Sequence, residues 1–390
     1  MTLAPGWDAQ AARLWQQGAQ MPAIQATLAA INASPAPKPV ALVLQLAYYL
    51  FLTGDVAAAA RFLSMGLQDN PDHPDLLRNL AACLSRSGQT GPAIEAARRY
   101  LALAPDDPAG WDTLAANLHR IGDPAAAEAG TRALVLKDRA VAPTEWRLPA
   151  PNAFGVDARP GLRNVVTFAL WGGNPRYLRG VLDNALAMPE VYPGWQMQVH
   201  ADATVPADLL EALTGLGVRV VAEAPDQPIA RRLAWRFHAA NDPGVNRFLV
   251  RDADSRINPR EAAAVAGWIA SGRWFHVMRD WWTHTDLVLA GMWGGVAGVL
   301  PPVAPLLDTY RPPHLETPNV DQWFLRDRVW PMLRQSCLVH DRCFDPPGAH
   351  RWPTPTPTGT AHVGQCEFTA NGPAQAARLA DWITRLPCLT

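Results

Sequence analysis

The chain has 390 residues, of which 49% are hydrophobic and 18% are charged, so it carries enough apolar material for two or three domains and is not disordered. Its formal net charge of −1 excludes the strongly basic class of nucleic-acid and anionic-membrane binders. Five cysteines do not suit a disulfide framework, no apolar run is long enough to span a bilayer, and the first ten residues lack the pattern of a signal peptide. We expect a soluble bacterial protein of the cytoplasm.

A repeat of 34 residues runs through the first third of the chain. Gly54, Gly88 and Gly122 mark one position of this repeat. The same interval separates further apolar positions, namely Leu46, Leu80 and Leu114, Ala47, Ala81 and Ala115, and Ala59, Ala93 and Ala127. Gly18 and Ala23 repeat the spacing of glycine and alanine once more, so a degenerate first copy precedes the clear ones. A fixed period of this length predicts stacked helical repeats.

Each copy is predicted to form two helices joined by a turn at the glycine, with the alanine allowing close helix packing. Trp111, Leu114, Ala115 and Leu118 fill the first-helix pattern of the last clear copy, and the repeat resembles the tetratricopeptide repeat. The resemblance implies an all-α solenoid over residues 1–140. Two interpretations stay open, a plain scaffold or a concave surface that binds a peptide or a partner protein.

Residues 141–162 lose the repeat and gain proline, which is typical of a linker. Residues 163–390 then alternate between apolar runs and amphipathic segments. Strands are predicted at 164–171, 195–202, 218–224, 247–252, 274–280 and 287–295. Helices are predicted at 175–186, 206–217, 229–241, 259–271 and 320–333. This order predicts an α/β domain with a mostly parallel, Rossmann-like sheet covered by helices.

An acidic motif directly follows the fourth predicted strand. Asp252 and Asp254 lie at the carboxyl end of that strand, the edge of an open α/β sheet where ligands bind. Two such carboxylates offer hard oxygen ligands to Mg²⁺ or Mn²⁺, which in turn can hold a diphosphate. The alternative is that Asp254 and Ser255 cap the helix that follows.

The order of motifs between residues 163 and 367 resembles the GT-A fold of nucleotide-sugar glycosyltransferases. Within that fold it resembles the retaining family of glycogenin and the bacterial lipopolysaccharide galactosyltransferases. The segments that carry the resemblance are the helix IARRLAWRF before RFLVRDADS, the segment LAGMWGGVAGVL (289–300), Asp321-Gln322, and Ala361-His362-Val363-Gly364. The string RDADSRINPREAAAVAGWIASGRWFHVMRDWWTH is also similar to bacterial repeat-linked proteins with glycosyltransferase domains. The resemblance implies sugar transfer from a nucleotide-sugar donor, with a UDP-sugar expected.

The same resemblance implies roles for the matching residues. The predicted metal ligands for Mn²⁺ or Mg²⁺ are Asp252, Asp254 and His362. The predicted donor contacts are Ala169, Leu170 and Asn174 for the base and ribose, Arg231, Arg236 and Asp252 for the diphosphate, and Gly294 for the sugar. The predicted reaction-centre residues are Asp321, Gln322 and Asp280. Past the fifth predicted strand, Trp281, Trp282 and His284 would form an acceptor platform, since tryptophans suit the apolar faces of sugars.

We expect retention of the anomeric configuration, with Asp321 and Gln322 steering a short-lived oxocarbenium ion. Inversion would instead make Asp280 or Asp321 the general base. The acceptor is expected to be a protein or a saccharide, with the repeats docking the acceptor or a membrane assembly.

Three other interpretations stay open. A non-catalytic adaptor would combine the repeats with a degenerate α/β domain. A structural zinc site would draw on Cys337, His340 and Cys343 together with later histidines and Cys366. A nucleotidyltransferase would need a glycine-rich phosphate loop after the first strand, and the turn at residues 171–175 is short for one.

Overall fold

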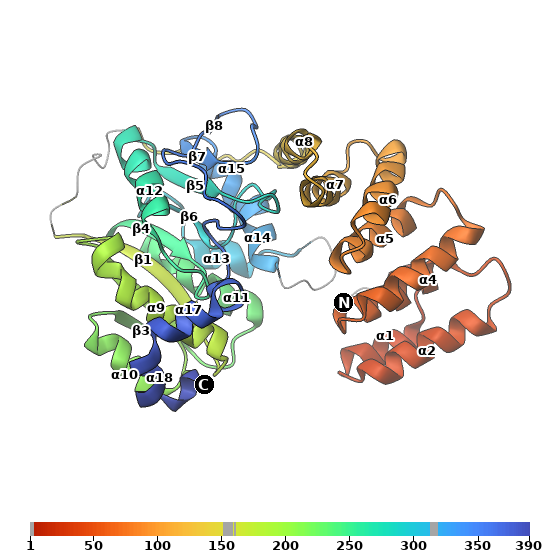
Figure 1. The fold of residues 1–390 in the computed structure, drawn as a ribbon, viewed down its shortest axis with the longest axis horizontal. Helices are drawn as coiled ribbons and strands as arrows, with labels where there is room; N and C mark the ends of the chain where they lie inside the picture. Colours follow the sequence, from red (N-terminus) through yellow and green to blue (C-terminus); the bar gives the residue numbers. More distant parts are fainter. Residues whose placement is uncertain (1–3, 151–158, 160, 313–318) are drawn as a thin grey trace. The chain divides into compact units, whose positions relative to one another are not determined.

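The computed structural model describes residues 4–150, 159, 161–312 and 319–390. Backbone contacts divide the chain into two compact units, Met1–Arg139 and Ala140–Thr390, and each is described by itself. The first unit is helical and the second has an α/β architecture (Figure 1). No helix in the described ranges is both long enough and apolar enough to span a bilayer.

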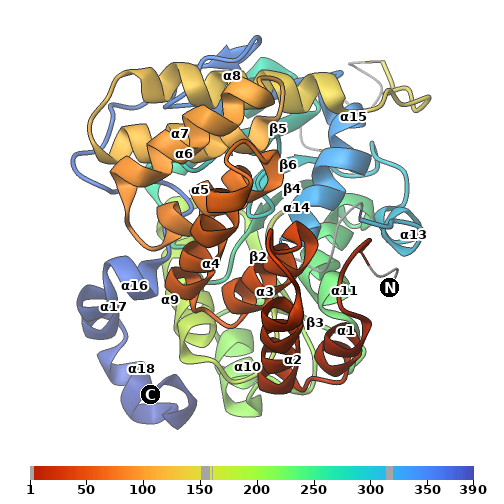
Figure 2. The same ribbon diagram turned by 90° about the vertical axis from the view of Figure 1, so that its right-hand side faces the viewer.

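The helical unit is a succession of helix pairs (Figure 2). Its helices are α1 (Ala9–Gln16), α2 (Gln20–Ala33), α3 (Val40–Leu52), α4 (Val56–Asp69), α5 (Pro74–Arg86), α6 (Thr90–Leu103), α7 (Pro108–Arg120) and α8 (Ala125–Ala140). A left-handed glycine joins the helices of each pair, with φ of +78° at Gly18, +90° at Gly54, +78° at Gly88 and +71° at Gly122. Glycine adopts this conformation without steric cost, which explains the repeated position.

The repeated alanines lie where helices pack together. Ala23, Ala59 and Ala93 are completely buried, whereas Ala127 of the last copy is only partly buried. The repeat leucine Leu46 is 1% exposed. Small side chains at these positions let neighbouring helices approach closely. The prediction of a tetratricopeptide-like solenoid is therefore confirmed over residues 9–140, the degenerate first copy included.

The α/β unit is built around one sheet. Its strands are β1 (Arg163–Leu170), β2 (Gln196–Ala201), β3 (Arg219–Ala222), β4 (Val245–Arg251), β5 (Phe275–Arg279), β6 (Met292–Val296), β7 (Cys337–Asp341) and β8 (Ala349–His350). Its α-helices are α9 (Pro175–Val191), α10 (Ala207–Gly215), α11 (Ile229–Ala234), α12 (Pro259–Ser271), α13 (Val303–Asp308), α14 (Val320–Phe324), α15 (Trp330–Leu333), α16 (Glu367–Ala370), α17 (Gly372–Arg378) and α18 (Ala380–Arg385). Three further turns are helical, namely the 3₁₀ helices η1 (Trp235–Asn241) and η3 (Pro387–Leu389) and the π-helix η2 (Leu325–Val329).

The strands follow the order β3-β2-β1-β4-β6-β5-β7-β8. All neighbouring pairs are parallel except those of β6, which runs antiparallel to β4 and β5. The sheet is therefore mixed. Trp293 of β6 anchors the core through edge contacts with Phe248 and Phe237, at centroid distances of 5.2 and 5.6 Å.

Three sequence predictions of secondary structure need correction. The helix predicted at 229–241 is α-helical only over α11 and continues as the 3₁₀ helix η1. The strand predicted at 287–295 begins only at Met292, and residues 287–291 form turns. Leu287 and Val288 are nevertheless buried, and a buried turn cannot be told from a strand by its apolar pattern. The helix predicted at 320–333 divides into α14, η2 and α15. Pro331 has no backbone N–H, so the regular hydrogen-bond ladder is interrupted before it.

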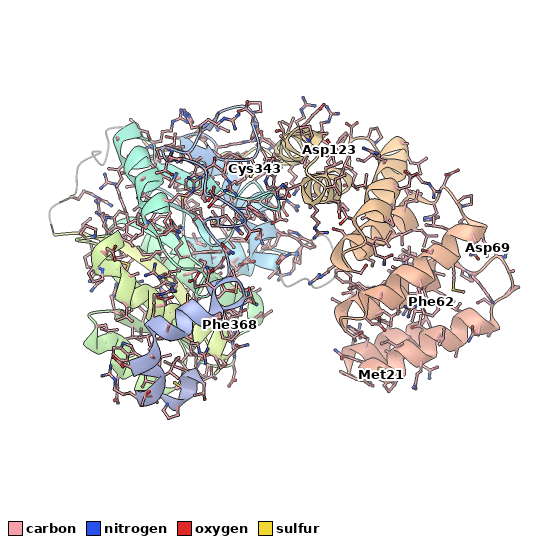
Figure 3. The ribbon with its side chains drawn as sticks, viewed as in Figure 1. Met21, Phe62, Asp69, Asp123, Cys343 and Phe368 are labelled. Atoms are coloured by element: carbon pink, nitrogen blue, oxygen red, sulfur yellow. The ribbon has the colours of Figure 1, made fainter. Side chains whose placement is uncertain are left out.

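The carboxyl-terminal helices pack against α9. Arg378 of α17 forms ion pairs of 2.7 Å with Asp183 of α9 and of 2.7 Å with Glu367. The guanidinium of Arg179, also on α9, lies 5.5 Å from the ring centre of Phe368, which Figure 3 labels. These contacts hold the segment after residue 363 against the sheet domain.

The structure describes part of the predicted linker 141–162. Trp146 Nε1 donates to the carbonyl oxygen of Val299 at 3.2 Å, and the carbonyl oxygen of Pro149 accepts from Trp274 Nε1 at 3.2 Å. Residues 146–149 therefore lie against the α/β unit. Residues 151–158 and 160 lie outside the described residues.

Gly180 of α9 packs directly on the loop after β4. A Cβ here would lie 2.0 Å from the carbonyl oxygen of Ala253, an overlap that only backbone movement can relieve. We expect Gly180→Ala to lower the free energy of unfolding by about 1–3 kcal/mol, as overpacking does. The matched control is Gly215→Ala at the end of α10, where a Cβ meets no atom within 4 Å. Urea unfolding followed by circular dichroism checks both, and equal midpoints would contradict this packing.

Candidate functional site

A cavity of about 360 Å³ opens at the carboxyl ends of β1 and β4. Its polar and charged lining residues are Arg176, Tyr177, Arg236, Asp252, Asp254, His284, Asn319, Asp321 and Gln322. From β1 the sheet continues to β2 and β3 on one side and to β4 on the other. The cavity therefore lies at the point where the strand order reverses, the usual ligand crevice of open α/β sheets.

The loop that carries the acidic pair is fixed by neighbouring segments. The side chain of Asn184, on α9, donates to the carbonyl oxygen of Ser255 at 2.8 Å. From the other side, the backbone N–H of Glu367 donates to the carbonyl oxygen of Asp254 at 2.8 Å. The loop therefore depends on α9 and on the carboxyl-terminal segment for its position.

The alternative that Asp254 and Ser255 cap the following helix is wrong. Asn258 caps α12, because its side chain accepts from the backbone N–H of Glu261 at 3.1 Å. The carboxylates of Asp252 and Asp254 line the cavity instead.

Each carboxylate of the pair contacts an arginine. Arg236 of η1 is 5% exposed, and its guanidinium bridges Asp252 and Asp321, with 3.1 Å between Nη2 and Asp321 Oδ2. Arg176 of α9 donates from Nε to Asp254 Oδ2 at 2.7 Å. Burial by itself would lower the pKa of Arg236, but its two carboxylate partners raise that pKa above the ordinary value. Arg236 therefore remains charged.

Asp321 depends on this arginine for its charge. Burial raises the pKa of Asp321, while Arg236 and the backbone N–H of Gln322 act to lower it. Two buried atoms at the cavity, Arg236 Nε and Gln322 Oε1, have no hydrogen-bond partner within the described part of the chain. Both atoms are buried, so a ligand in the cavity would pair with them only after neighbouring side chains move.

His284 is held in one tautomer. The backbone N–H of Asp280 donates to His284 Nδ1 at 3.0 Å, so the ring proton is on Nε2. Burial, followed by the neighbouring His362 and arginines, lowers the pKa of His284 to about 3. The imidazole is therefore neutral at pH 7. Because it lines the cavity, it offers a fixed hydrogen-bond donor there.

The structure brings eight of the predicted site residues together around the cavity. They are Ala169, Leu170, Arg236, Asp252, Asp254, His284, Asp321 and Gln322. They come from segments as far apart in the sequence as Ala169 and Gln322, so the fold brings them together.

Three predicted donor contacts lie outside the cavity lining. Asn174 is the N-cap of α9 and accepts from the backbone N–H of Arg176 at 3.0 Å. The side chain of Arg231 is 47% exposed and pairs with Asp308. Gly294 lies within β6, where a Cβ would be 2.4 Å from the carbonyl oxygen of Phe248. Because Gly294 has no side chain, β6 can pack closely against β4.

Asp280 also lies outside the lining and has partners on several sides. It is completely buried, forms ion pairs with Arg260 at 2.9 Å and Arg342 at 3.2 Å, and accepts from the backbone N–H of Val363 at 2.8 Å. This carboxylate holds the segment 362–364 in place. His362 next to it does not line the cavity, and its Nδ1 lies 2.7 Å from the carbonyl oxygen of Thr360.

The predicted acceptor tryptophans are packed against other side chains. Trp281 stacks on His362 at a centroid distance of 4.6 Å, with the Arg342 guanidinium 5.1 Å from its ring centre. Trp282 makes an edge contact with Phe344 at 5.8 Å. Both indoles are half-buried and neither lines the cavity.

Sequence reasoning missed Arg176 and Gly291. Arg176 follows Pro175 in the first turn of a helix that begins just after β1. A basic residue next to a strand end could have been predicted from the sequence to lie at the ligand site. Gly291 lies beside the acidic pair, and a Cβ there would be 2.1 Å from Asp252 Oδ2. The glycine in contact with the site thus precedes β6, three residues before Gly294.

The cysteine-rich segment forms part of the core. Cys337 begins the buried strand β7, and Cys343, labelled in Figure 3, is 6% exposed. His340 Nδ1 lies 2.8 Å from His276 Nε2. Among the described residues, Cys337, His340 and Cys343 do not belong to any group of three or more side chains that could hold one metal ion.

The bridge made by Arg236 gives a stability prediction. Arg236→Ala leaves Asp321 buried without its counterion, so we expect a loss of about 3–5 kcal/mol in the free energy of unfolding. The control Arg231→Ala removes an exposed pair and should cost less than about 1 kcal/mol. Adding Asp321→Asn to Arg236→Ala should restore part of the loss. Chemical denaturation checks the series, and similar losses for the two arginine variants would contradict a buried bridge.

Comparisons with known proteins cover chiefly the helical unit. A family model for the tetratricopeptide repeat matches residues 50–118. MamA from Desulfovibrio magneticus is 19% identical, with a TM-score of 0.30 over 32% of this chain and 71% of that one. A mutant O-GlcNAc transferase from Thermobaculum terrenum is 17% identical, with a TM-score of 0.37 over 62% of this chain. The match spans 44% of the length of that enzyme. No curated protein matches the chain.

Proposed function

We propose that residues 163–390 form a GT-A-type glycosyltransferase domain that transfers a sugar from a nucleotide-sugar donor, most simply a UDP-sugar. One observation carries the proposal. The cavity at the strand-order reversal combines an acidic pair, two arginines and a neutral histidine donor. Groups of these kinds can bind a diphosphate and the hydroxyls of a sugar together.

The acidic pair fits a divalent cation, Mn²⁺ or Mg²⁺. Each carboxylate has one oxygen on an arginine, whereas Asp252 Oδ2 and Asp254 Oδ1 make no hydrogen bond with the described residues. The cavity lining has two arginines and three aspartates, a formal charge of −1. A donor diphosphate would add two negative charges, and a divalent cation offsets them. Such a cation supplies Lewis-acid stabilisation of the leaving diphosphate.

The chain's own residues would bind and orient the donor. Arg236 and Gln322 line the cavity, where their side chains would contact a phosphate oxygen and a sugar hydroxyl. His284 donates from Nε2, because its Nδ1 is occupied by the backbone N–H of Asp280. These contacts use polar side chains that line the cavity.

The surroundings of the two candidate bases support retention. Asp321 is paired with Arg236, and Asp280 is outside the cavity lining, in ion pairs with Arg260 and Arg342. Asp280 is therefore away from an incoming hydroxyl in the cavity, and the Asp321 carboxylate is already engaged by Arg236. We therefore propose front-face transfer with retention, in which polar groups guide the acceptor and no dedicated base is used.

The repeats would present the acceptor, a protein or a saccharide, to this domain. A second candidate function is a non-catalytic adaptor, favoured by the solenoid and its family match at residues 50–118. Such an adaptor needs the repeats to bind a partner but needs no nucleotide at the cavity. Nucleotide binding therefore distinguishes the two functions.

We expect UDP-sugars to raise the melting temperature of the protein in the presence of Mn²⁺, and EDTA to remove the effect. Asp254→Asn should weaken nucleotide binding at least tenfold, because it removes one carboxylate ligand. Asp308→Asn is the matched control, since Asp308 pairs with Arg231 away from the cavity lining. Isothermal titration calorimetry checks the affinities. A wild-type protein that binds no nucleotide sugar would support the adaptor.

The stereochemistry of transfer is a separate prediction. The product, or the free sugar released by slow hydrolysis, should initially have the donor's anomeric configuration. Proton NMR recorded during the first turnovers, before mutarotation, measures this directly. An inverted product would contradict retention and would return Asp321 or Asp280 to the role of general base.

A further inference from the structure

A second cluster of potential ligands lies one strand away from the cavity. His200 is on β2, Glu223 directly follows β3, and His238 is on η1. His200 Nδ1 lies 2.7 Å from Glu223 Oε1, and His238 Nδ1 lies 3.6 Å from the same oxygen. One ligand atom from each residue falls within 4.8 Å of the others. The three side chains thus converge on one point from three different elements.

We propose that His200, Glu223 and His238 form a binding site for a borderline transition metal of the Zn²⁺ class. Tetrahedral zinc with nitrogen and carboxylate ligands needs about 2.0–2.2 Å to each atom, which places neighbouring ligand atoms about 3.3 Å apart. The distances of 2.7 and 3.6 Å lie on either side of that value. The donor set of two imidazoles and one carboxylate also differs from the acidic pair, which offers only oxygen.

A metal would take the place of the proton that now lies between His200 and Glu223. The 2.7 Å between His200 Nδ1 and Glu223 Oε1 is a hydrogen-bond distance, so one of these two atoms carries a proton. Metal ligands must be deprotonated, so metal binding here would release that proton.

Polar groups next to His200 form an outer layer of contacts. Gln198 Nε2 lies 2.8 Å from His200 Nε2, and Gln198 Oε1 accepts from Arg219 at 3.0 Å. With a metal on Nδ1, the ring proton moves to Nε2, and a half-turn of the Gln198 amide presents its oxygen to that proton. Arg219 keeps its ion pair with Asp242 at 2.8 Å. That rotation gives up the hydrogen bond from Arg219 to Gln198 Oε1, so Arg219 would be held by Asp242 alone.

The position of His238 leaves room for a water ligand and for entry. Its side chain is 39% exposed, whereas that of His200 is 3% exposed. Three protein ligands leave a fourth tetrahedral position open, and the exposed side of His238 is where solvent reaches it.

A metal here would join the sheet edge to the helix that carries Arg236. His238 is two residues after Arg236 in η1, and His200 is paired in register with Ala169, which lines the cavity. Binding energy at this site would thus hold η1 against β2 and β3. The inference rests on the cluster alone and does not depend on the proposed glycosyltransferase activity.

The test uses the full-length protein, freed of metal by chelation and then titrated with Co²⁺, whose visible absorption reports tetrahedral nitrogen ligands. We expect one equivalent to bind with this absorption and to be displaced by Zn²⁺. Zn²⁺ should also raise the melting temperature. His238→Ala and Glu223→Gln should each weaken Co²⁺ binding at least tenfold.

Two controls separate this site from others. His350→Ala removes an exposed histidine elsewhere in the same unit and should leave the titration unchanged. Asp252→Asn combined with Asp254→Asn removes the acidic pair and should also leave the Co²⁺ absorption intact. Circular dichroism establishes that each variant is folded. Absent absorption in the wild type, or absorption that survives His238→Ala, would show a hydrogen-bonded triad without a metal and would overturn the inference.

Discussion

The guanidinium of Arg236 is the interaction on which the cavity depends. It joins Asp252, in the loop after β4, to Asp321 at the start of α14, and it is buried between them. A buried carboxylate that loses its counterion is protonated or displaced, so this one cation stabilises the buried Asp321 and joins two segments that are distant in the sequence. Arg236 also lines the cavity. Packing and the proposed ligand binding therefore rest on a single side chain.

Close backbone approach is the second constraint. Gly180 brings α9 against Ala253, and Gly291 brings the turn before β6 against Asp252. In both places a methyl group would overlap the acidic loop. The same helix α9 provides Arg176 for Asp254, so one element both supports the loop and neutralises part of its charge. Asp280 has the corresponding role on the opposite side, where its ion pairs and its hydrogen bond to Val363 fix the segment that contributes Gly364.

Two clusters of different chemistry flank β1. The cavity offers carboxylate oxygens, which suit Mg²⁺ or Mn²⁺, and the cluster of His200, Glu223 and His238 offers imidazole nitrogens, which suit Zn²⁺. Helix η1 contributes to both, through Arg236 and His238. A change in the position of η1 would therefore alter the geometry of both clusters.

The sequence by itself determined the helical repeats, most strands of the α/β unit and the place of Asp252 and Asp254 at a strand end. These features follow from local rules, because a left-handed glycine, an apolar period and a strand end are encoded within a few residues. Only the tertiary structure decided that Arg176 meets Asp254, that Asp280 and His362 lie outside the cavity lining, and that β6 runs antiparallel. Those outcomes depend on strand order and on ion pairs between segments far apart in the chain, and local sequence does not specify which charges meet.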